Sequence, residues 1–319
     1  MDISLVIPLF NEEENVGLLY DEVSSVLSKM DYQSEIIFID DGSTDTTLKS
    51  LVQIQVGDPR VKVVSLRRNF GQTAAMSAGF DNASGQIIVT MDGDLQNDPN
   101  DIPTMIDKLK EGFDVVTGWR YDRKDPFLSR KLPSQIANKI ISWVTGVSLH
   151  DYGCTLKAFR KTVIRNLNLY GEMHRFIPAI ASGMGISFTE VKVNHRARRF
   201  GTSKYGITRT IRVVLDLMTV KFLLSYATRP LHVFGTVGVA SSFLGFCIAF
   251  VMIIQRQFLG VGLANRPLLL MAVLLIFMGV QFITMGLLAE LVVRTYHESQ
   301  RKPIYFVRDI YENSGKIEG

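Results

Sequence analysis

Two long segments without a charged side chain lie near the C-terminus of the chain. Leu231–Ile254 and Pro267–Ala289 contain no Asp, Glu, Lys or Arg. A helix rises about 1.5 Å per residue, so each segment can cross the roughly 30 Å hydrocarbon layer of a bilayer. Two such segments are difficult to bury in a soluble domain, and the mean hydropathy of +0.16 agrees with membrane insertion. The sequence therefore predicts two transmembrane helices, at 231–254 and 267–289, in a multi-pass membrane protein.

Basic residues lie on both sides of the predicted pair of spans. Lys221 and Arg229 precede the first span, whereas the loop between the spans carries two arginines. The basic residues after the second span are Arg294, Arg301, Lys302 and Arg308. Because cytoplasmic loops are enriched in Lys and Arg, both flanks are predicted to lie on the cytoplasmic face of the inner (plasma) membrane. Residues 292–319 would form a cytoplasmic tail, and we expect its polar end, Glu312–Gly319, to be poorly ordered and to take no part in the fold.

The segment before the first span is basic and amphipathic. Between Lys192 and Arg212 the chain carries seven basic residues and no acidic one. In Ile207–Tyr226, apolar residues recur at spacings of three and four and form one stripe along a helix. A basic amphipathic helix beside a span is typical of a helix that lies on an anionic membrane surface. We therefore predict a juxtamembrane helix over 206–228, with an ordinary core helix as the alternative, followed by a transmembrane region over 229–291.

The first two hundred residues alternate short β-branched runs with helical segments. The predicted strands are Ile3–Leu9, Ile36–Asp40, Val61–Leu66, Ile87–Met91 and Val115–Thr117. Such alternation predicts an α/β fold in which helices cover a doubly wound, mostly parallel sheet, and we assign residues 1–205 to this domain. Ligands of such sheets bind beyond the carboxyl ends of the strands.

Polar residues gather where these five strands end. The segments are Asn11-Glu12, Asp40-Asp41-Gly42-Ser43, Arg67-Arg68-Asn69, Asp92-Gly93-Asp94 with Gln96, and Arg120. No Gly-x-Gly-x-x-Gly follows the first strand and no Walker-type glycine loop is present, which disfavours a dinucleotide site and a P-loop. A bound diphosphate would then need a divalent cation, and the Asp-x-Asp pair Asp92 and Asp94 suits Mg²⁺ or Mn²⁺. The net charge of +4 is too small to indicate nucleic-acid binding.

Five motifs occur in order along the chain. They are Val6-Ile7-Pro8 with Asn11-Glu12, Ile39-Asp40-Asp41-Gly42-Ser43-Thr44-Asp45, Met91-Asp92-Gly93-Asp94-Leu95-Gln96, Asp151-Tyr152-Gly153-Cys154 and Arg198-Arg199-Phe200-Gly201-Thr202-Ser203-Lys204. This pattern resembles inverting family-2 glycosyltransferases of the GT-A fold. The last motif resembles their polyprenyl-phosphate branch, which includes dolichyl-phosphate mannose synthases and bactoprenol glucosyltransferases. The two spans are similar to those of the bactoprenol enzymes, whereas single-domain dolichyl synthases lack them.

The resemblance implies a role for each motif residue. Binding of the nucleotide sugar falls to Pro8, Asn11, Glu12, Asp40, Asp41, Asp92 and Arg120. A Mg²⁺ or Mn²⁺ cofactor would be held by Asp92, Asp94 and Gln96. Contacts with the acceptor phosphate fall to Arg123, Arg130, Arg198, Ser203 and Lys204. Asp94 and Asp151 are the implied catalytic residues, and Asp151 near the acceptor would act either as a base or as an orienting group.

The function that the resemblance implies is transfer of a hexose, with inversion, from a sugar nucleotide to undecaprenyl or another polyprenyl phosphate. UDP-glucose is the expected donor, and the lipid-linked sugar would serve a cell-envelope glycan or O-antigen modification. A polyprenyl-phosphate mannosyl- or amino-sugar transferase is an alternative, as is a membrane protein that binds a nucleotide without catalysis. A processive polysaccharide synthase is disfavoured because neither Trp119 nor Trp143 ends a Gln-x-x-Arg-Trp motif. Exposed amphipathic helices also favour association into a homo-oligomer.

Overall fold

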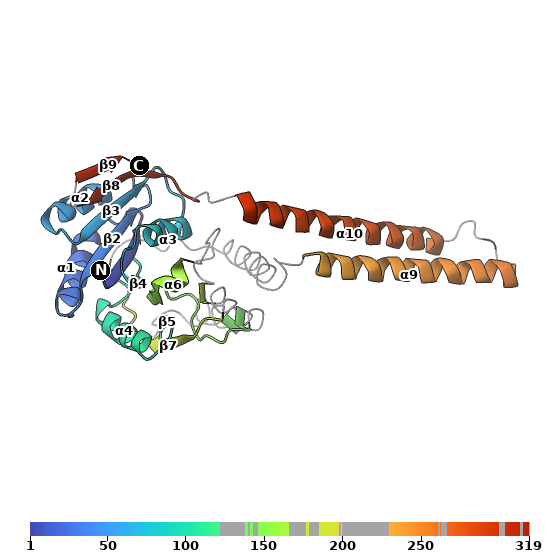
Figure 1. Ribbon diagram of the computed structural model, residues 1–319, viewed down its shortest axis with the longest axis horizontal. Helices are drawn as coiled ribbons and strands as arrows, with labels where there is room; N and C mark the ends of the chain where they lie inside the picture. The colour runs from blue at the N-terminus through green and yellow to red at the C-terminus, as the bar shows by residue number, and fades with distance from the viewer. Residues whose placement is uncertain are drawn as a thin grey trace. The chain divides into compact units, whose positions relative to one another are not determined.

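A computed structural model describes residues 1–121, 138–139, 141–142, 146–165, 177–178, 185–197, 199, 230–260, 262, 267–299, 304–312 and 315–318. The chain divides into two units (Figure 1). The first unit comprises Met1–Val220 and Pro303–Gly319, and the second comprises Lys221–Lys302. The chain therefore leaves the first unit for the apolar segments and then returns to it.

The first unit is built on a nine-stranded sheet, counted over the described residues. Its strands are β1 (Ile3–Leu9), β2 (Ser34–Asp40), β3 (Val61–Leu66), β4 (Ile87–Thr90), β5 (Val115–Trp119), β6 (Lys157–Arg160), β7 (Phe188–Lys192), β8 (Val307–Glu312) and β9 (Gly315–Glu318). Their order across the sheet is β7-β5-β6-β4-β1-β2-β3-β8-β9. The predicted α/β class is confirmed, and the five strands expected from the sequence are all present.

The sheet is mixed, and its centre is parallel. β1 pairs in parallel with β2 and with β4, and β2 pairs in parallel with β3. The unexpected strand β6 lies antiparallel between β4 and β5, so that β4 and β5 run in the same direction. The carboxyl ends of all five expected strands consequently lie at one edge of the sheet, as the sequence predicts.

Helices cover both faces of the sheet (Figure 1). Helices α1 (Val16–Ser28), α2 (Thr47–Gly57) and α4 (Ile102–Lys110) form one core with alternate β1 residues such as Leu5 and Ile7. Helix α3 (Gln72–Asp81) covers the opposite face of β1, β2 and β3. α3 packs closely on the sheet because Gly79 faces it. A Cβ added to Gly79 would lie only 2.2 Å from Val6 Cγ1. Two short helices, η1 (Pro99–Asp101) and α6 (Lys161–Ile164), complete the described helices of this unit.

The C-terminal residues form two strands of the same sheet. β8 pairs antiparallel with β3, and β9 pairs antiparallel with β8. The expectation that Glu312–Gly319 takes no part in the fold is therefore wrong. The physical reason is that β3 would otherwise be an exposed edge strand with unpaired backbone groups, and β8 covers it despite its polar sequence.

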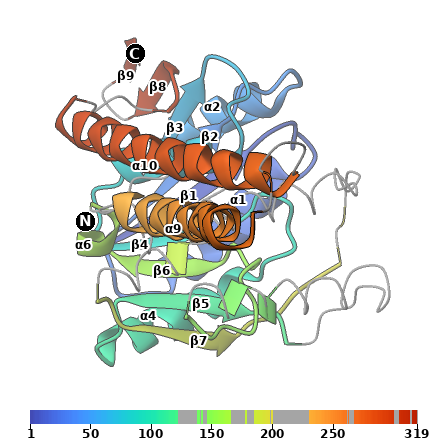
Figure 2. The ribbon, with the colours of Figure 1, turned by 90° about the vertical axis from the view of Figure 1, so that its right-hand side faces the viewer.

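The second unit contains a pair of long helices, α9 (Pro230–Leu259) and α10 (Pro267–Ser299), which run side by side (Figure 2). Both are long and apolar enough to span a membrane, and 17% and 11% of their apolar windows are buried. The two helices approach closely at glycines. A Cβ added to Gly279 would lie only 2.4 Å from the Gly238 carbonyl oxygen, so a larger residue would not fit there. The surface that these helices leave exposed is apolar, as lipid contact requires. The predicted juxtamembrane helix 206–228 lies outside the described residues.

Candidate active site

The ends of β1 and β2 are joined by a reciprocal set of hydrogen bonds. Asn11 accepts from the Thr44 backbone N–H at 2.8 Å, and its own backbone N–H donates to Ser43 Oγ at 3.0 Å. The backbone of Asn11 has φ +54°, a conformation that asparagine tolerates better than most residues. Glu12 donates its backbone N–H to Thr47 Oγ1 at 2.9 Å, which ties β1 to the start of α2. These two predicted nucleotide residues thus lie at the junction between β1 and β2.

Asp40 and Asp41 are buried and bond to different parts of the site. Asp40 accepts from the Ser43 backbone N–H at 3.1 Å and from Ser65 Oγ at 3.3 Å. Asp41 accepts from the backbone N–H groups of Phe70 and Gly71, at 2.8 and 2.9 Å. Burial raises the pKa of Asp41, while these two hydrogen bonds act in the opposite direction. Asp41 therefore fixes the loop between β3 and α3.

The Asp-x-Asp pair lies directly after β4. Asp92 accepts from Gln72 Nε2 at 2.7 Å, and Asp94 accepts from the Gln96 backbone N–H at 3.2 Å. Burial, and then the charge of Asp94, raise the pKa of Asp92 to about 6. A Cβ on the intervening Gly93 would lie 2.2 Å from Leu9 Cδ2, so glycine lets this turn pack against the end of β1.

The donor set at this turn fits a hard divalent cation. Asp92 and Asp94 bring two carboxylates together, and a cation bound there would offset their charge. Mg²⁺ or Mn²⁺ commonly takes one or two protein carboxylates and completes its shell with phosphate oxygens. Among the described residues, no group of three or more His, Cys, Asp or Glu side chains is arranged to hold a metal. The arrangement thus matches a cation shared with a bound diphosphate rather than a closed metal site.

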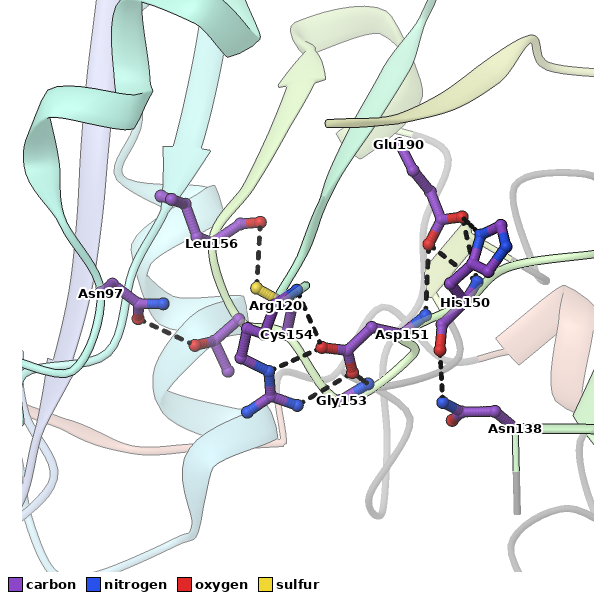
Figure 3. A network of polar contacts seen from close by, with 10 residues as sticks. Asn97, Arg120, Asn138, His150, Asp151, Gly153, Cys154, Leu156 and Glu190 are labelled. Atoms are coloured by element: carbon purple, nitrogen blue, oxygen red, sulfur yellow. Dashed lines mark hydrogen bonds and ion pairs between the residues drawn. The ribbon is translucent and has the colours of Figure 1, made fainter. Parts of the chain in front are cut away.

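Arg120 and Asp151 form a buried ion pair at the end of β5 (Figure 3). Arg120 Nε lies 2.6 Å from Asp151 Oδ2, and Arg120 Nη2 lies 2.9 Å from Asp151 Oδ1. The Gly153 backbone N–H also donates to Oδ1, at 3.1 Å. Their side chains are 14% and 7% exposed. Because both carboxylate oxygens accept hydrogen bonds, the geometry favours an orienting role for Asp151 over that of a base.

Glu190 of β7 holds the segment that carries Asp151 (Figure 3). Its carboxylate accepts from the backbone N–H groups of His150 and Asp151, at 2.9 and 3.2 Å. It also lies 2.8 Å from His150 Nδ1. The His150 ring stacks on Trp119, with 4.2 Å between ring centroids. Glu190 is therefore a positioning residue that sequence reasoning missed, because a single acid in a short strand carries no distinctive signal.

Lys157, the first residue of β6, places a second cation in the interior of the site. The residue is 2% exposed. Burial lowers its pKa to about 8, while the charges of Cys154, Asp151 and Asp92 act to raise it. The sequence analysis missed this residue because β6 was not predicted.

Arg196 and its neighbours brace the turn after β4 from the other side. The Arg196 backbone N–H donates to the Gln96 carbonyl at 2.9 Å, and Asn97 forms a β-bridge with His195. The Arg196 guanidinium lies 2.6 Å from Glu22 and 2.9 Å from Asp98. Asn97 accepts from the Asp92 backbone N–H and from Thr155 Oγ1, both at 3.2 Å. The loop that carries Asp92, Asp94 and Gln96 is thus fixed on two sides.

The described part of the predicted site gathers at one edge of the sheet. It comprises Pro8, Asn11, Glu12, Asp40, Asp41, Asp92, Asp94, Gln96, Arg120 and Asp151. The structure adds Gln72, Asn97, Lys157, Glu190 and Arg196. The predicted acceptor-phosphate residues Arg123, Arg130, Arg198, Ser203 and Lys204 lie outside the described residues.

Known proteins resemble this chain in sequence and in fold. The family described as glycosyl transferase family 2 matches residues 4–168. A dodecaprenyl-phosphate galacturonate synthase of Rhizobium johnstonii is 46% identical over 321 residues, which cover 99% of this chain and 95% of that protein. An undecaprenyl-phosphate 4-deoxy-4-formamido-L-arabinose transferase of Salmonella choleraesuis is 38% identical over 310 residues, which cover 97% of this chain and 93% of that protein.

A solved structure has the same fold at low sequence identity. It is glucosyl-3-phosphoglycerate synthase of Mycobacterium tuberculosis in complex with Mn²⁺, UDP-glucose and phosphoglyceric acid. The TM-score is 0.55 at 19% identity, over 70% of this chain and 79% of that chain. The likeness concerns the architecture of the sheet and its helices.

Proposed function

Because this chain belongs to glycosyl transferase family 2, we propose that it transfers a sugar, with inversion, from a nucleoside diphosphate to a polyprenyl phosphate at a membrane surface. The observation that carries the proposal is the pairing of Asp92 and Asp94 with the buried Arg120–Asp151 pair at one sheet edge. The alignment of nearly the whole chain with two polyprenyl-phosphate sugar transferases supports the acceptor class. The two apolar helices would keep the enzyme beside its lipid substrate.

The donor would lie across the ends of β1, β2 and β4. Asn11, Glu12 and Asp41 would hold the nucleoside, with Pro8 and Asp40 behind them. Asp92, Asp94 and Gln96 would hold the cation and the diphosphate. The cation would supply positive charge to the departing nucleoside diphosphate. Arg120, held by Asp151, would direct its remaining N–H groups toward the sugar and phosphates.

The acceptor phosphate needs little help from a base. Its second pKa is about 6, so at neutral pH it is already an anionic nucleophile. The task of the protein is then to bring two anions together in line, and Arg198, Ser203 and Lys204 are the proposed acceptor contacts, with Arg123 and Arg130. Attack from the face opposite the leaving group inverts the anomeric centre. Asp151 would orient Arg120 and stabilise developing positive charge on the sugar.

Three candidate donor sugars follow from different observations. The motifs resemble bactoprenol glucosyltransferases, which favours glucose from UDP-glucose. The relative that is 46% identical is a galacturonate synthase, which favours a UDP-linked uronic acid. The buried cation Lys157 is compatible with a sugar carboxylate, whereas a neutral hexose would not need it. A formamido-arabinose donor is the third candidate, supported by the relatives at 37–38% identity.

We also propose that the catalytic domain and the C-terminal strands share the cytoplasmic side of the membrane. The strands β8 and β9 belong to the same sheet as β1–β3, so the chain crosses the bilayer an even number of times between them. The basic residues that flank the spans support a cytoplasmic location for this side. The assignment of 1–205 as catalytic domain, 206–228 as interfacial helix and 229–291 as membrane region is part of this proposal.

A donor screen tests the proposed function. Purified protein in detergent is mixed with undecaprenyl phosphate and radiolabelled UDP-glucose, UDP-galacturonate, UDP-4-deoxy-4-formamido-L-arabinose or GDP-mannose, with Mn²⁺ or Mg²⁺. Label in the lipid extract identifies the donor, and the Asp94→Asn variant serves as the inactive control. Absence of lipid-linked label with every donor, from protein that is folded by circular dichroism, would contradict the proposal.

A further inference from the structure

The segment Ile304–Glu312, which follows the second span, contacts the loop after β3. Arg67 donates its backbone N–H to the Phe306 carbonyl at 3.0 Å. Arg67 Nε also donates to the Val307 carbonyl at 3.3 Å. The β8 part of the segment continues this contact as a partner of β3. The loop of residues 67–71 therefore has a neighbour that lies more than two hundred residues away in sequence.

Two aromatic residues of this segment make contacts at the two ends of α3. Tyr305 Oη donates to Asp81 Oδ2, at the end of α3, over 2.6 Å. Burial and the Asp81 carboxylate both raise the pKa of Tyr305, which keeps its hydroxyl a donor at neutral pH. The Phe306 ring lies 6.1 Å from the Phe70 ring, centroid to centroid, just before α3 begins. Arg68 in turn lies over the Phe70 ring, at 4.7 Å from its centroid.

The same loop supplies the two amides that hold Asp41. Phe70 and Gly71 donate their backbone N–H groups to the two carboxylate oxygens. Gly42, the next residue in the chain, has φ +68°, and a Cβ there would lie 2.5 Å from the Arg68 carbonyl carbon. The loop and the Asp41–Gly42 turn are therefore in direct backbone contact. A shift of the loop would move Asp41.

Most side chains of the loop are exposed, so its contacts with Asp41, Gly42 and the C-terminal segment carry much of its stability. Arg67, Arg68 and Asn69 are exposed, and Phe70 is half-buried. Exposed loops with few buried contacts open at low free-energy cost, so a neighbouring segment has a large influence on their populations. Phe306 and Tyr305 make their contacts near the two ends of α3, the helix that follows this loop.

We propose that Tyr305 and Phe306 are positioning residues of the donor site. Phe306 holds the loop 67–71 directly, and Tyr305 holds the far end of α3, the helix that follows the loop. Through the Phe70 and Gly71 amides of the loop, the two residues set the orientation of Asp41 for the nucleoside. The identity of the nucleoside ligand rests on the proposed function, whereas the positioning of the loop does not. The C-terminal segment is thereby a structural part of the nucleotide site, although it follows the membrane helices in the sequence.

Amide hydrogen exchange and nucleotide affinity test this proposal together. The variants are Phe306→Ala, which removes a ring that is 64% exposed, and Tyr305→Phe, which removes one oxygen. Glu312→Gln is the control in the same C-terminal segment, because it breaks the 2.9 Å ion pair between Glu312 at the end of β8 and Lys62 of β3, away from the loop. We expect exchange of the Phe70 and Gly71 amides to accelerate about three- to tenfold in Phe306→Ala, as loss of an aromatic pair predicts. The Kd for UDP should rise by a similar factor, with kcat at saturating donor retained.

The outcomes separate the proposal from the proposed function. Exchange at wild-type rates in both variants overturns the positioning role, whatever the UDP affinity. Equal acceleration in Glu312→Gln also overturns it, because the effect would then report general loosening of β8. Should Phe306→Ala fail to fold, Tyr305→Phe decides the question alone. Wild-type protein that binds no UDP contradicts the proposed function, while the exchange rates still test the role of the two aromatic residues.

Discussion

Replacement of Asp151 by Asn gives the sharpest test of how the site is assembled. Asn keeps the shape of Asp but carries no charge, so the buried guanidinium of Arg120 loses its counterion while one neutral hydrogen bond can persist. Removal of one partner from a buried ion pair costs about 3–5 kcal/mol. A domain of about 150–250 residues loses roughly 2–4 °C in Tm for each kcal/mol. The expected fall in Tm is therefore about 6–20 °C.

A double variant separates the charge effect from the loss of packing. In Arg120→Gln with Asp151→Asn, neither residue is charged, so no unpaired charge remains buried. We expect the double variant to unfold at a higher temperature than Asp151→Asn, with a coupling of about 2 kcal/mol. Circular dichroism of detergent-solubilised protein during heating provides the measurement. A fall in Tm typical of a surface pair, worth less than about 1 kcal/mol, would refute the inference that this pair is desolvated.

The pH dependence of turnover decides the chemical role of Asp151. If Asp151 orients Arg120, the residual activity of Asp151→Asn should keep the wild-type pH profile while kcat/KM falls. If Asp151 acts as a base, the acidic limb of the profile should disappear with the carboxylate. Initial rates with radiolabelled donor from pH 5 to 9, an interval of about four units, distinguish these two outcomes.

Three further predictions concern the cation and the membrane. Asp94→Asn should fold and lose about 100-fold in kcat, which corresponds to about 2.7 kcal/mol. EDTA should abolish wild-type activity until Mn²⁺ or Mg²⁺ is restored, and full activity in EDTA would contradict the role of the cation. Because the pKa of Asp92 is raised to about 6, protons compete with the cation below that pH. The Mn²⁺ affinity measured by calorimetry should therefore be constant above about pH 7 and fall by up to about tenfold per pH unit below pH 6. An affinity that stays constant down to pH 5 would exclude Asp92 as a ligand. In intact cells, a cysteine at position 260 should react with an impermeant maleimide and one at position 314 should not; the reverse pattern would invert the proposed topology.

The sequence predicted the parallel centre of the fold because its signals are local. β1 and β3 are mostly apolar and rich in β-branched residues, and their observed bounds match the predicted ones. The two apolar segments were equally readable, since each is a long run without a charged residue inside a longer helix. β6 and β8 were missed because Lys157, Arg160 and the charged residues of β8 interrupt any apolar pattern. Their pairing depends on neighbours that the sequence alone does not place beside them.

The members of the candidate site come from local motifs, whereas the partners that hold them do not. Asp41 was expected to face a nucleoside, but its carboxylate also holds the loop before α3. Asp151 was expected near an acceptor, either as a base or as an orienting group, and its bidentate contact with Arg120 could not be foreseen from the sequence. Glu190 and Arg196 come from the end of the domain, where β7 brings them beside β5 and the turn after β4. Such contacts follow from tertiary packing and have no local motif.

The charges in the described part of the site bear on the proposed role of the basic motif after β7. Around the Asp-x-Asp turn and the Arg120–Asp151 pair alone, Asp92, Asp94 and Asp151 contribute three negative charges, and Arg120 and Lys157 offset two of them. A divalent cation would reverse the remaining negative charge, which suits the diphosphate of one substrate. The acceptor brings a second phosphate of nearly two charges, and the guanidinium of Arg120 is already paired with Asp151. We propose that further cations come from the segment after β7, because in sequence Arg198 and Lys204 lie within twelve residues of Lys192, where that strand ends.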